Sequence, residues 1–194
     1  MNLWPIISAI REELDRKDGL RERAIGISRK CVRLCRESIN LTHRKEFSAA
    51  EEKFAEAKRS FSELRSALAN YGDIYSAGYV VVAAQELTEA CLLHGHLSGR
   101  DLPDPVEIGV EGGEYLLGLC DFVGELRREV LVSLMGGDIR GAEAHYRVME
   151  AIYEGISPIA YPRGLIDLKQ KTDLCRSMVE KSLEDLTRAK VMKG

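Results

Sequence analysis

The chain has 194 residues, a length that suits one domain with a sizeable core, and 45% of its residues are hydrophobic. Its formal net charge is −3, so it is not basic as a whole, and it has no apolar run long enough to predict a transmembrane helix. The first 19 residues carry acids early and no basic leader, which argues against a signal peptide, and five cysteines outside any disulfide pattern predict reduced thiols in a cytoplasmic protein.

Positive charge gathers near the start of the chain. A helix is predicted over residues 3–15, a kink or short break at 17–19, and a second helix over 20–44. Residues 20–45 hold eight basic and two acidic side chains, a net charge of +6 that leaves −9 for the rest. A basic stripe on an apolar back suits binding to phosphate backbones, although a solvated face or salt bridges to the acidic remainder would give the same pattern. The candidate nucleic-acid-binding residues are Arg29, Lys30, Arg33, Arg36, Arg44 and Lys45.

Two further helices are predicted in the middle of the chain. The first covers 47–70 and carries phenylalanines at heptad spacing, which indicates a side that faces a core. A turn at 71–73 follows, and Asp73 is the predicted N-cap of a helix that runs to about residue 97.

Two glutamates interrupt the most apolar part of that helix. Glu86 and Glu89 are three residues apart and therefore share a face, while most of residues 79–93 are apolar. Carboxylates are almost never fully buried unless they are paired or bind a metal, and no Lys or Arg lies between Arg65 and Arg100. The pair therefore needs a partner from elsewhere or a metal ion.

A second pair of acids lies on the next predicted helix, over 106–134, which Gly112-Gly113 either loosens or breaks. Asp121 and Glu125 are one turn apart on a narrow polar stripe between apolar flanks. Like charges at this spacing repel, and a cation would remove the repulsion. The competing interpretation is a solvated face in which Arg128 pairs with Glu125. Taken together, the two carboxylate pairs suggest an oxygen-ligand site for a hard cation such as Mg²⁺.

The last third of the chain completes an all-helical prediction. Asp138 is expected to cap a helix to about residue 154, a loop follows, and a final helix covers about 163–190. We therefore predict an all-α antiparallel bundle of six to seven helices that forms a single domain over 1–194. His94 and His96 are interpreted as polar residues near a helix end.

Several segments resemble the translin superfamily. The segment EYLLGLCDFVGELRR, residues 114–128, resembles its hallmark segment, and QELTEA at 85–90 resembles the Glu-x-x-Glu segment of the Trax branch. Residues 137–139 with Tyr153, and LKQKTDLCRSMVEK at 168–181, are also similar to the family. The resemblance covers most of the chain and implies a protomer of about seven helices that assembles into a closed octamer around nucleic acid.

The resemblance also implies a function. Trax-type subunits are Mg²⁺-dependent endoribonucleases, and the matching positions here are Glu86, Glu89 and Asp121, with Glu125 as a further acid. These four are the expected catalytic and metal-binding residues, for Mg²⁺ or for Mn²⁺ or Ca²⁺ as substitutes. Translin-type subunits instead bind RNA and single-stranded DNA with an Arg/His-rich stretch, and residues 70–80 contain no Arg or His.

Two alternatives to the endoribonuclease remain. One is a non-catalytic, translin-like protein that binds single-stranded RNA or DNA and uses its acids structurally. The other is a purely structural helical assembly protein. The expected partners are RNA or single-stranded DNA and further copies of the chain itself, with no membrane, and the need for a separate translin partner is left open.

Overall fold

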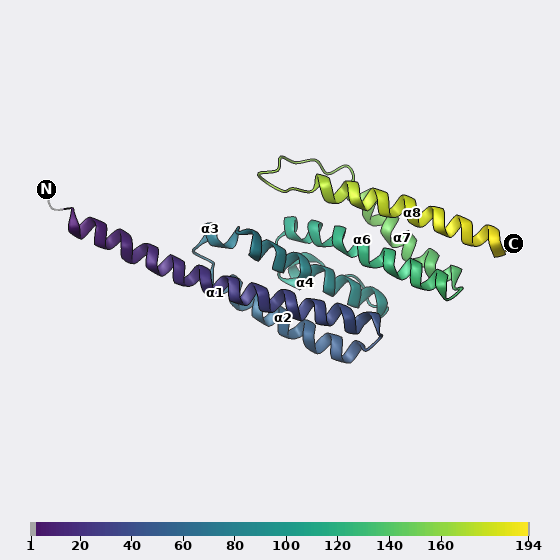
Figure 1. Ribbon diagram of the computed structural model, residues 1–194, viewed down its shortest axis with the longest axis horizontal. Helices are drawn as coiled ribbons and strands as arrows, with labels where there is room; N and C mark the ends of the chain where they lie inside the picture. Colours follow the sequence, from purple (N-terminus) through teal and green to yellow (C-terminus); the bar gives the residue numbers. More distant parts are fainter. Residues whose placement is uncertain (1–2, 194) are drawn as a thin grey trace.

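The computed structural model describes residues 3–193, and these residues form eight α-helices and no strand (Figure 1). The all-α prediction is confirmed, and the count exceeds six or seven because two helices consist of a single turn. The predicted domain 1–194 includes residues 1–2 and 194, which lie outside the described residues. The helices are α1 Trp4–His43, α2 Phe47–Ala67, α3 Gly72–Tyr75, α4 Gly78–Leu97, α5 Pro105–Ile108, α6 Gly112–Met135, α7 Ile139–Ile156 and α8 Lys169–Lys193.

Helices α4 and α6 form the centre of the bundle. α1 packs against α2 and α4, α4 packs against α6, and α6 packs against α7 and α8. One hydrophobic cluster contains buried side chains from all eight helices. α4 is apolar around most of its circumference because three longer helices cover it, and Val80, Leu87 and Leu92 are fully buried.

A glycine sets the distance between the two central helices. A Cβ atom placed on Gly118 of α6 would lie 2.5 Å from the Cβ of Thr88 and 3.0 Å from the carbonyl oxygen of Gln85, both on α4. Real Cβ atoms do not approach other atoms so closely, so only glycine permits this approach. Gly118 therefore allows the acidic faces of α4 and α6 to lie close together.

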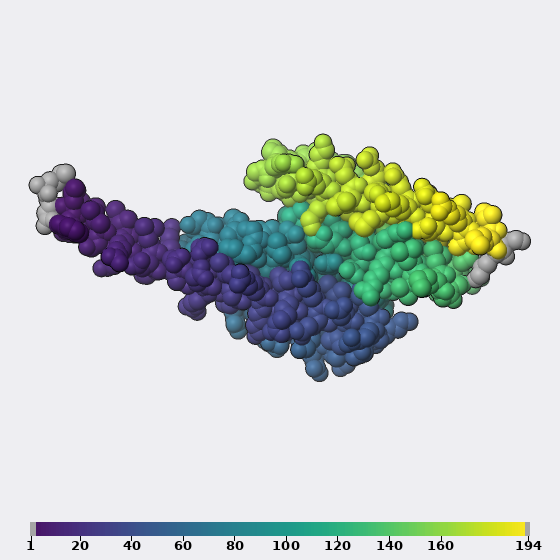
Figure 2. Space-filling view, in the orientation of Figure 1, coloured from purple at the N-terminus to yellow at the C-terminus, as the bar shows by residue number. Residues whose placement is uncertain are grey.

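The predicted break at residues 17–19 is wrong, because α1 is one helix of 40 residues. Gly19 alone costs only about 1 kcal/mol in a helix interior. Local ion pairs support the segment, including Arg11 with Asp15 and Arg21 with Asp18, and Lys17 contacts Asp73 at 3.3 Å. The first turns of α1 extend beyond the packed body (Figures 1 and 2).

Other boundaries differ from the prediction where a turn depends on backbone geometry. The break before α6 falls at Gly109, which has φ of 90°, and not at Gly112-Gly113. Asp73 lies in the first turn of α3, while Ala77 is the N-cap of α4, so its predicted capping role is wrong. The last helix begins at Lys169 and not near 163, because the preceding loop inserts the buried side chains of Ile166 and Leu168 into the core.

The predicted cap of α7 is confirmed: an Asp138 carboxylate oxygen accepts a hydrogen bond from the Gly141 backbone N–H at 2.9 Å. All five cysteines are free thiols, and four of them are buried. Among the described residues, no helix combines the length and apolar character needed to cross a bilayer.

Candidate functional site: an acid pocket beside a basic groove

The four predicted acids line one cavity. Glu86 and Glu89 come from α4, and Asp121 and Glu125 come from α6, so both predicted pairs face the same space of about 410 Å³. Lys171, Leu174 and Met178 of α8 close its other side. We call this cavity the acid pocket. The sequence predicted the spacing within each pair, and the packing of α4 on α6 joins the two pairs.

Three of the four acids contact a basic side chain from a distant part of the chain. A guanidinium nitrogen of Arg36 in α1 lies 2.8 Å from Glu86, and Lys171 Nζ lies 2.5 Å from each oxygen of Asp121. His43 Nε2 lies 2.6 Å from Glu125 Oε2. The predicted alternative of an Arg128–Glu125 pair is therefore not the observed one.

His43 connects two carboxylates at the end of α1. Its Nδ1 lies 2.7 Å from Glu129 Oε1, and only 5% of its side chain is exposed. Burial lowers the pKa of His43, but the hydrogen bonds to Glu125 and Glu129 outweigh burial and raise the pKa to about 9. At neutral pH, His43 is therefore an imidazolium that donates to both carboxylates.

Glu89 is the acid of the pocket for which the described residues provide neither an ion pair nor a hydrogen bond. Burial is the main reason that its pKa rises to about 8, and the nearby charges of Asp121, Glu125 and Glu86 raise it further. An ionised Glu89 is therefore costly here. A cation placed between Glu89 and its neighbours would remove this cost.

The donor set of the pocket fits Mg²⁺ in kind, because carboxylate oxygens are the protein ligands that this ion prefers. The observed arrangement does not yet form a coordination sphere: within residues 3–193, no group of three or more His, Cys, Asp or Glu side chains is placed so that it could hold a metal ion. Three of the four carboxylates contact basic side chains instead.

The predicted basic residues separate into two groups. Arg29, Arg33 and Arg36 line a groove of about 510 Å³ together with Asn40 of α1 and Tyr79 and Val82 of α4. We call this the basic groove. The other three candidates are exposed but do not line it: Lys30 pairs with Glu56 at 2.9 Å, Arg44 pairs with Glu46 at 2.6 Å, and Lys45 follows the end of α1.

Arg36 joins the basic groove to the acid pocket. It lines the groove, and it also donates a hydrogen bond to Glu86, which lines the pocket. A polyanion that lies along the groove would therefore reach the acids without leaving the surface of α1 and α4.

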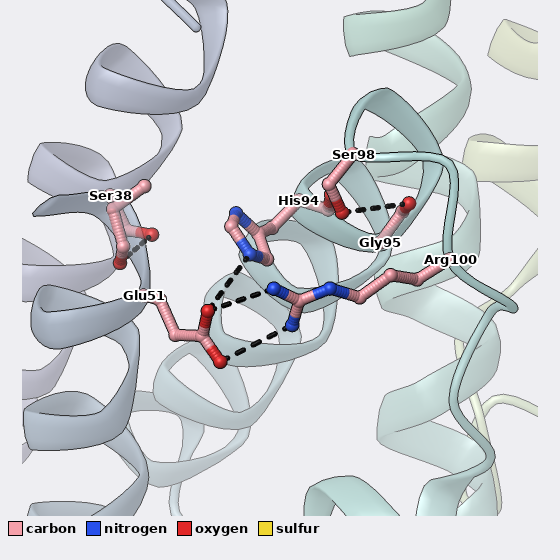
Figure 3. A network of polar contacts seen from close by, with 7 residues as sticks. Ser38, Glu51, His94, Gly95, Ser98 and Arg100 are labelled. Atoms are coloured by element: carbon pink, nitrogen blue, oxygen red, sulfur yellow. Dashed lines mark hydrogen bonds and ion pairs between the residues drawn. The ribbon is translucent and has the colours of Figure 1, made fainter. Parts of the chain in front are cut away.

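A separate polar cluster ties α2 to the end of α4 (Figure 3). Arg100 binds both carboxylate oxygens of Glu51, at 3.2 and 2.9 Å, and His94 Nε2 lies 3.9 Å from Glu51. His94 lies in the last turn of α4, as predicted, but it is buried, with 5% of its surface exposed, and its ring nitrogens have no hydrogen-bond partner among the described residues. None of these three residues lines the acid pocket.

His43 and Lys171 were not predicted from the sequence. Each lies 50 or more residues from the acid that it contacts, so no local spacing could reveal the pair. The only available indication of Lys171 was its position within the family-like segment 168–181.

Comparison with known proteins identifies the family of this chain. The model of the Translin family matches residues 19–187, which is most of the chain. The chain belongs to the Translin family. The matched residues include the basic groove, all four acids, His43 and Lys171.

Solved structures with the same fold include members that resemble this translin-family chain along nearly its whole length. The crystal structure of AfC3PO is 31% identical, with a TM-score of 0.87, and the match covers 96% of this chain and 97% of that one. The structure of AfC3PO in complex with duplex RNA is 30% identical over the same shares, with a TM-score of 0.82. Apo-NeC3PO is 23% identical over 95% of this chain and 97% of that one, with a TM-score of 0.85, which shows the shared fold alone.

A curated relative matches over a shorter stretch. An uncharacterized protein of Methanocaldococcus jannaschii is 32% identical over 110 residues, or 56% of this chain. The chain spans half the length of that protein.

Proposed function

We propose that this translin-family protein is a Trax-type, metal-dependent endoribonuclease whose active site is the acid pocket. The observation that carries the proposal is Glu89, a partly buried carboxylate that has no ion-pair or hydrogen-bond partner among residues 3–193 and faces three other carboxylates in one cavity. Strongly perturbed acids in a cleft are typical of functional sites. The Glu-x-x-Glu pair of α4 supports the Trax-type assignment, as does the absence of Arg and His from residues 70–80.

Different residues bind the phosphate backbone and the metal ion in the proposed reaction. Arg29 and Arg33 hold the phosphate backbone in the basic groove, and Arg36 positions it next to the acids. Glu86, Glu89 and Asp121 would hold Mg²⁺, and His43 fixes the orientation of Glu125 beside them. Mg²⁺ bound there supplies polarisation of the phosphodiester and neutralises the negative charge that develops during hydrolysis. No histidine is needed as a general base.

The duplex RNA in the AfC3PO complex supports RNA as the ligand. The basic groove binds backbone phosphates and offers no evident reading of base sequence, so single-stranded DNA is a further ligand of the same chemistry. Recognition of backbone charge predicts strong salt dependence and little sequence preference.

Self-association into an octamer completes the proposal. Leu3, Ile7, Ile10 and Leu14 follow heptad spacing on the part of α1 that extends from the body, and each is about half exposed or more. Such a stripe is typical of a helix that packs against another helix. A second copy of the chain is the partner that we propose for it.

The alternative function is non-catalytic binding of RNA or single-stranded DNA. The specific observation in its favour is that three of the four acids already have basic partners and that no metal-binding arrangement is present among the described residues. In that case the acids serve the structure of the pocket.

A cleavage assay separates the two functions. Purified protein is incubated with end-labelled RNA in Mg²⁺ or in a chelator, and its mass in solution is measured by light scattering in parallel. We expect cleavage only with Mg²⁺, and a mass several times the 21.7 kDa of one chain. RNA binding without cleavage in any divalent ion would favour the alternative, and a stable monomer would contradict the proposed assembly.

A further inference from the structure

Lys171 is placed where a divalent cation would need to bind. It belongs to the first turn of α8, and its Nζ lies 2.5 Å from both carboxylate oxygens of Asp121. Its side chain is 27% exposed, and that of Asp121 is 33% exposed. The ammonium group therefore occupies the side of Asp121 that an ion would use, inside the acid pocket.

Lys171 differs from the other two basic partners in how it is held. His43 is almost fully buried and is fixed by two glutamates, whereas Arg36 is 66% exposed and contacts the outer edge of the pocket through Glu86. Lys171 contacts one acid and has a long, flexible stem. Releasing it frees Asp121, whose charge is the strongest electrostatic influence on the unpaired Glu89.

The side chain of Lys171 borders a second cavity that it can enter when it leaves Asp121. Lys171 also lines an adjoining cavity of about 710 Å³, together with Gln85 of α4, Arg163 of the loop before α8 and Gln170 of α8. A change of rotamer can therefore move the ammonium group between two cavities without moving α8.

We propose that Lys171 is a tethered cation that competes with the divalent metal ion for Asp121 and so sets the Mg²⁺ concentration at which the acid pocket fills. This inference rests on the proposed function, because it takes the acid pocket to be a metal site. A unit positive charge a few ångströms from a dication repels it strongly in a partly buried pocket. Loading the pocket therefore requires that Lys171 leave Asp121.

The test is the binding of Mg²⁺ to the full chain in the absence of RNA, followed by titration calorimetry. Lys171→Met keeps a long unbranched side chain and removes its charge, so we expect the Kd for Mg²⁺ to fall by at least about tenfold. Lys171→Arg retains the charge and should stay near wild type. Lys169→Met is the matched control, since it removes a charge from an exposed position in the same turn of α8.

An unchanged or larger Kd in Lys171→Met overturns the inference, and Lys171→Gln serves as the second neutral variant if the first does not fold. Thermal unfolding followed by circular dichroism identifies a variant that does not fold. Cleavage of RNA by wild type distinguishes a failure of the proposed competition from a failure of the proposed function. If wild type still cleaves with Mg²⁺ while neutral variants gain no affinity, only the competition fails. If wild type neither binds Mg²⁺ nor cleaves, the proposed function fails as well.

Discussion

Glu89 has a predictable effect on the stability of the metal-free protein. Its pKa in the folded chain is about 8, against an ordinary value of 4.5. Between these pH values the folded protein keeps a proton that the unfolded chain releases, so the contribution of Glu89 to stability is fully present below about pH 4.5 and is lost as the pH rises through about 8. The side chain that makes the pocket suitable for a cation therefore weakens the fold when no cation is bound.

We expect Glu89→Gln to raise the free energy of unfolding of the metal-free protein by at least about 1 kcal/mol at pH 8, and to flatten its dependence on pH. Urea unfolding in a chelator at several pH values measures both effects. Glu63→Gln, at an exposed position of α2, is the control and should change little. A variant that is less stable than wild type throughout would show that ionised Glu89 is held by a favourable contact.

At this scale the sequence revealed the acids but not their partners. Helical periodicity alone places Glu86 with Glu89, and Asp121 with Glu125, on common faces. No basic residue lies near Glu86 in the sequence, yet Arg36 reaches it from 50 residues away. Pairing between helices depends on which helices pack together, and local patterns contain no information about that.

Gly118 makes the strongest prediction at the scale of the helices. Gly118→Ala places a methyl group against Thr88, so α4 and α6 must separate, and we expect a loss of about 1–3 kcal/mol in unfolding free energy. Gly124→Ala in the same helix is the matched control. Its Cβ would lie 3.8 Å from the sulfur of Met178, an ordinary contact, so stability should stay equal or rise slightly. Chemical denaturation compares the two, and equal stabilities would contradict the close approach of α4 and α6.

The basic groove is also a property of two helices, α1 and α4. Replacing both Arg29 and Arg33 by Ala should weaken binding of RNA and single-stranded DNA alike. Each lost phosphate contact should flatten the slope of log affinity against log salt by about 0.7 to 0.9. Arg59→Ala on the exposed side of α2 is the control. A double variant whose slope equals that of wild type would show that the stripe is only a solvated face.

Helix positions were largely predictable, while several boundaries were not. Apolar periodicity located the long helices, and Asp138 correctly marked the start of α7. Glycines misled the prediction in both directions: Gly19 continues a helix, whereas Gly109 ends one with a positive φ. Glycine can either continue a helix or end one, and the surrounding packing decides which of the two occurs.

For the whole molecule, the fold places a cation-rich groove and an acid-rich pocket side by side on a chain with a net charge of −3. The +6 of residues 20–45 is partly neutralised by ion pairs with acids outside this segment, namely Glu46, Glu56 and Glu86. Arg29 and Lys45 form no such pair among the described residues. Local charge and not total charge therefore determines where a polyanion binds.

The central claim is that the acid pocket cuts RNA, and the most direct test compares cleavage by wild type and Glu89→Gln at saturating RNA and Mg²⁺. The variant keeps the size and polarity of the side chain but removes its charge. We expect cleavage to fall by at least about a hundredfold, the scale of losing one strong electrostatic element of an active site. RNA binding should persist, because the basic groove is unchanged. Equal rates of cleavage by the two proteins would contradict the account.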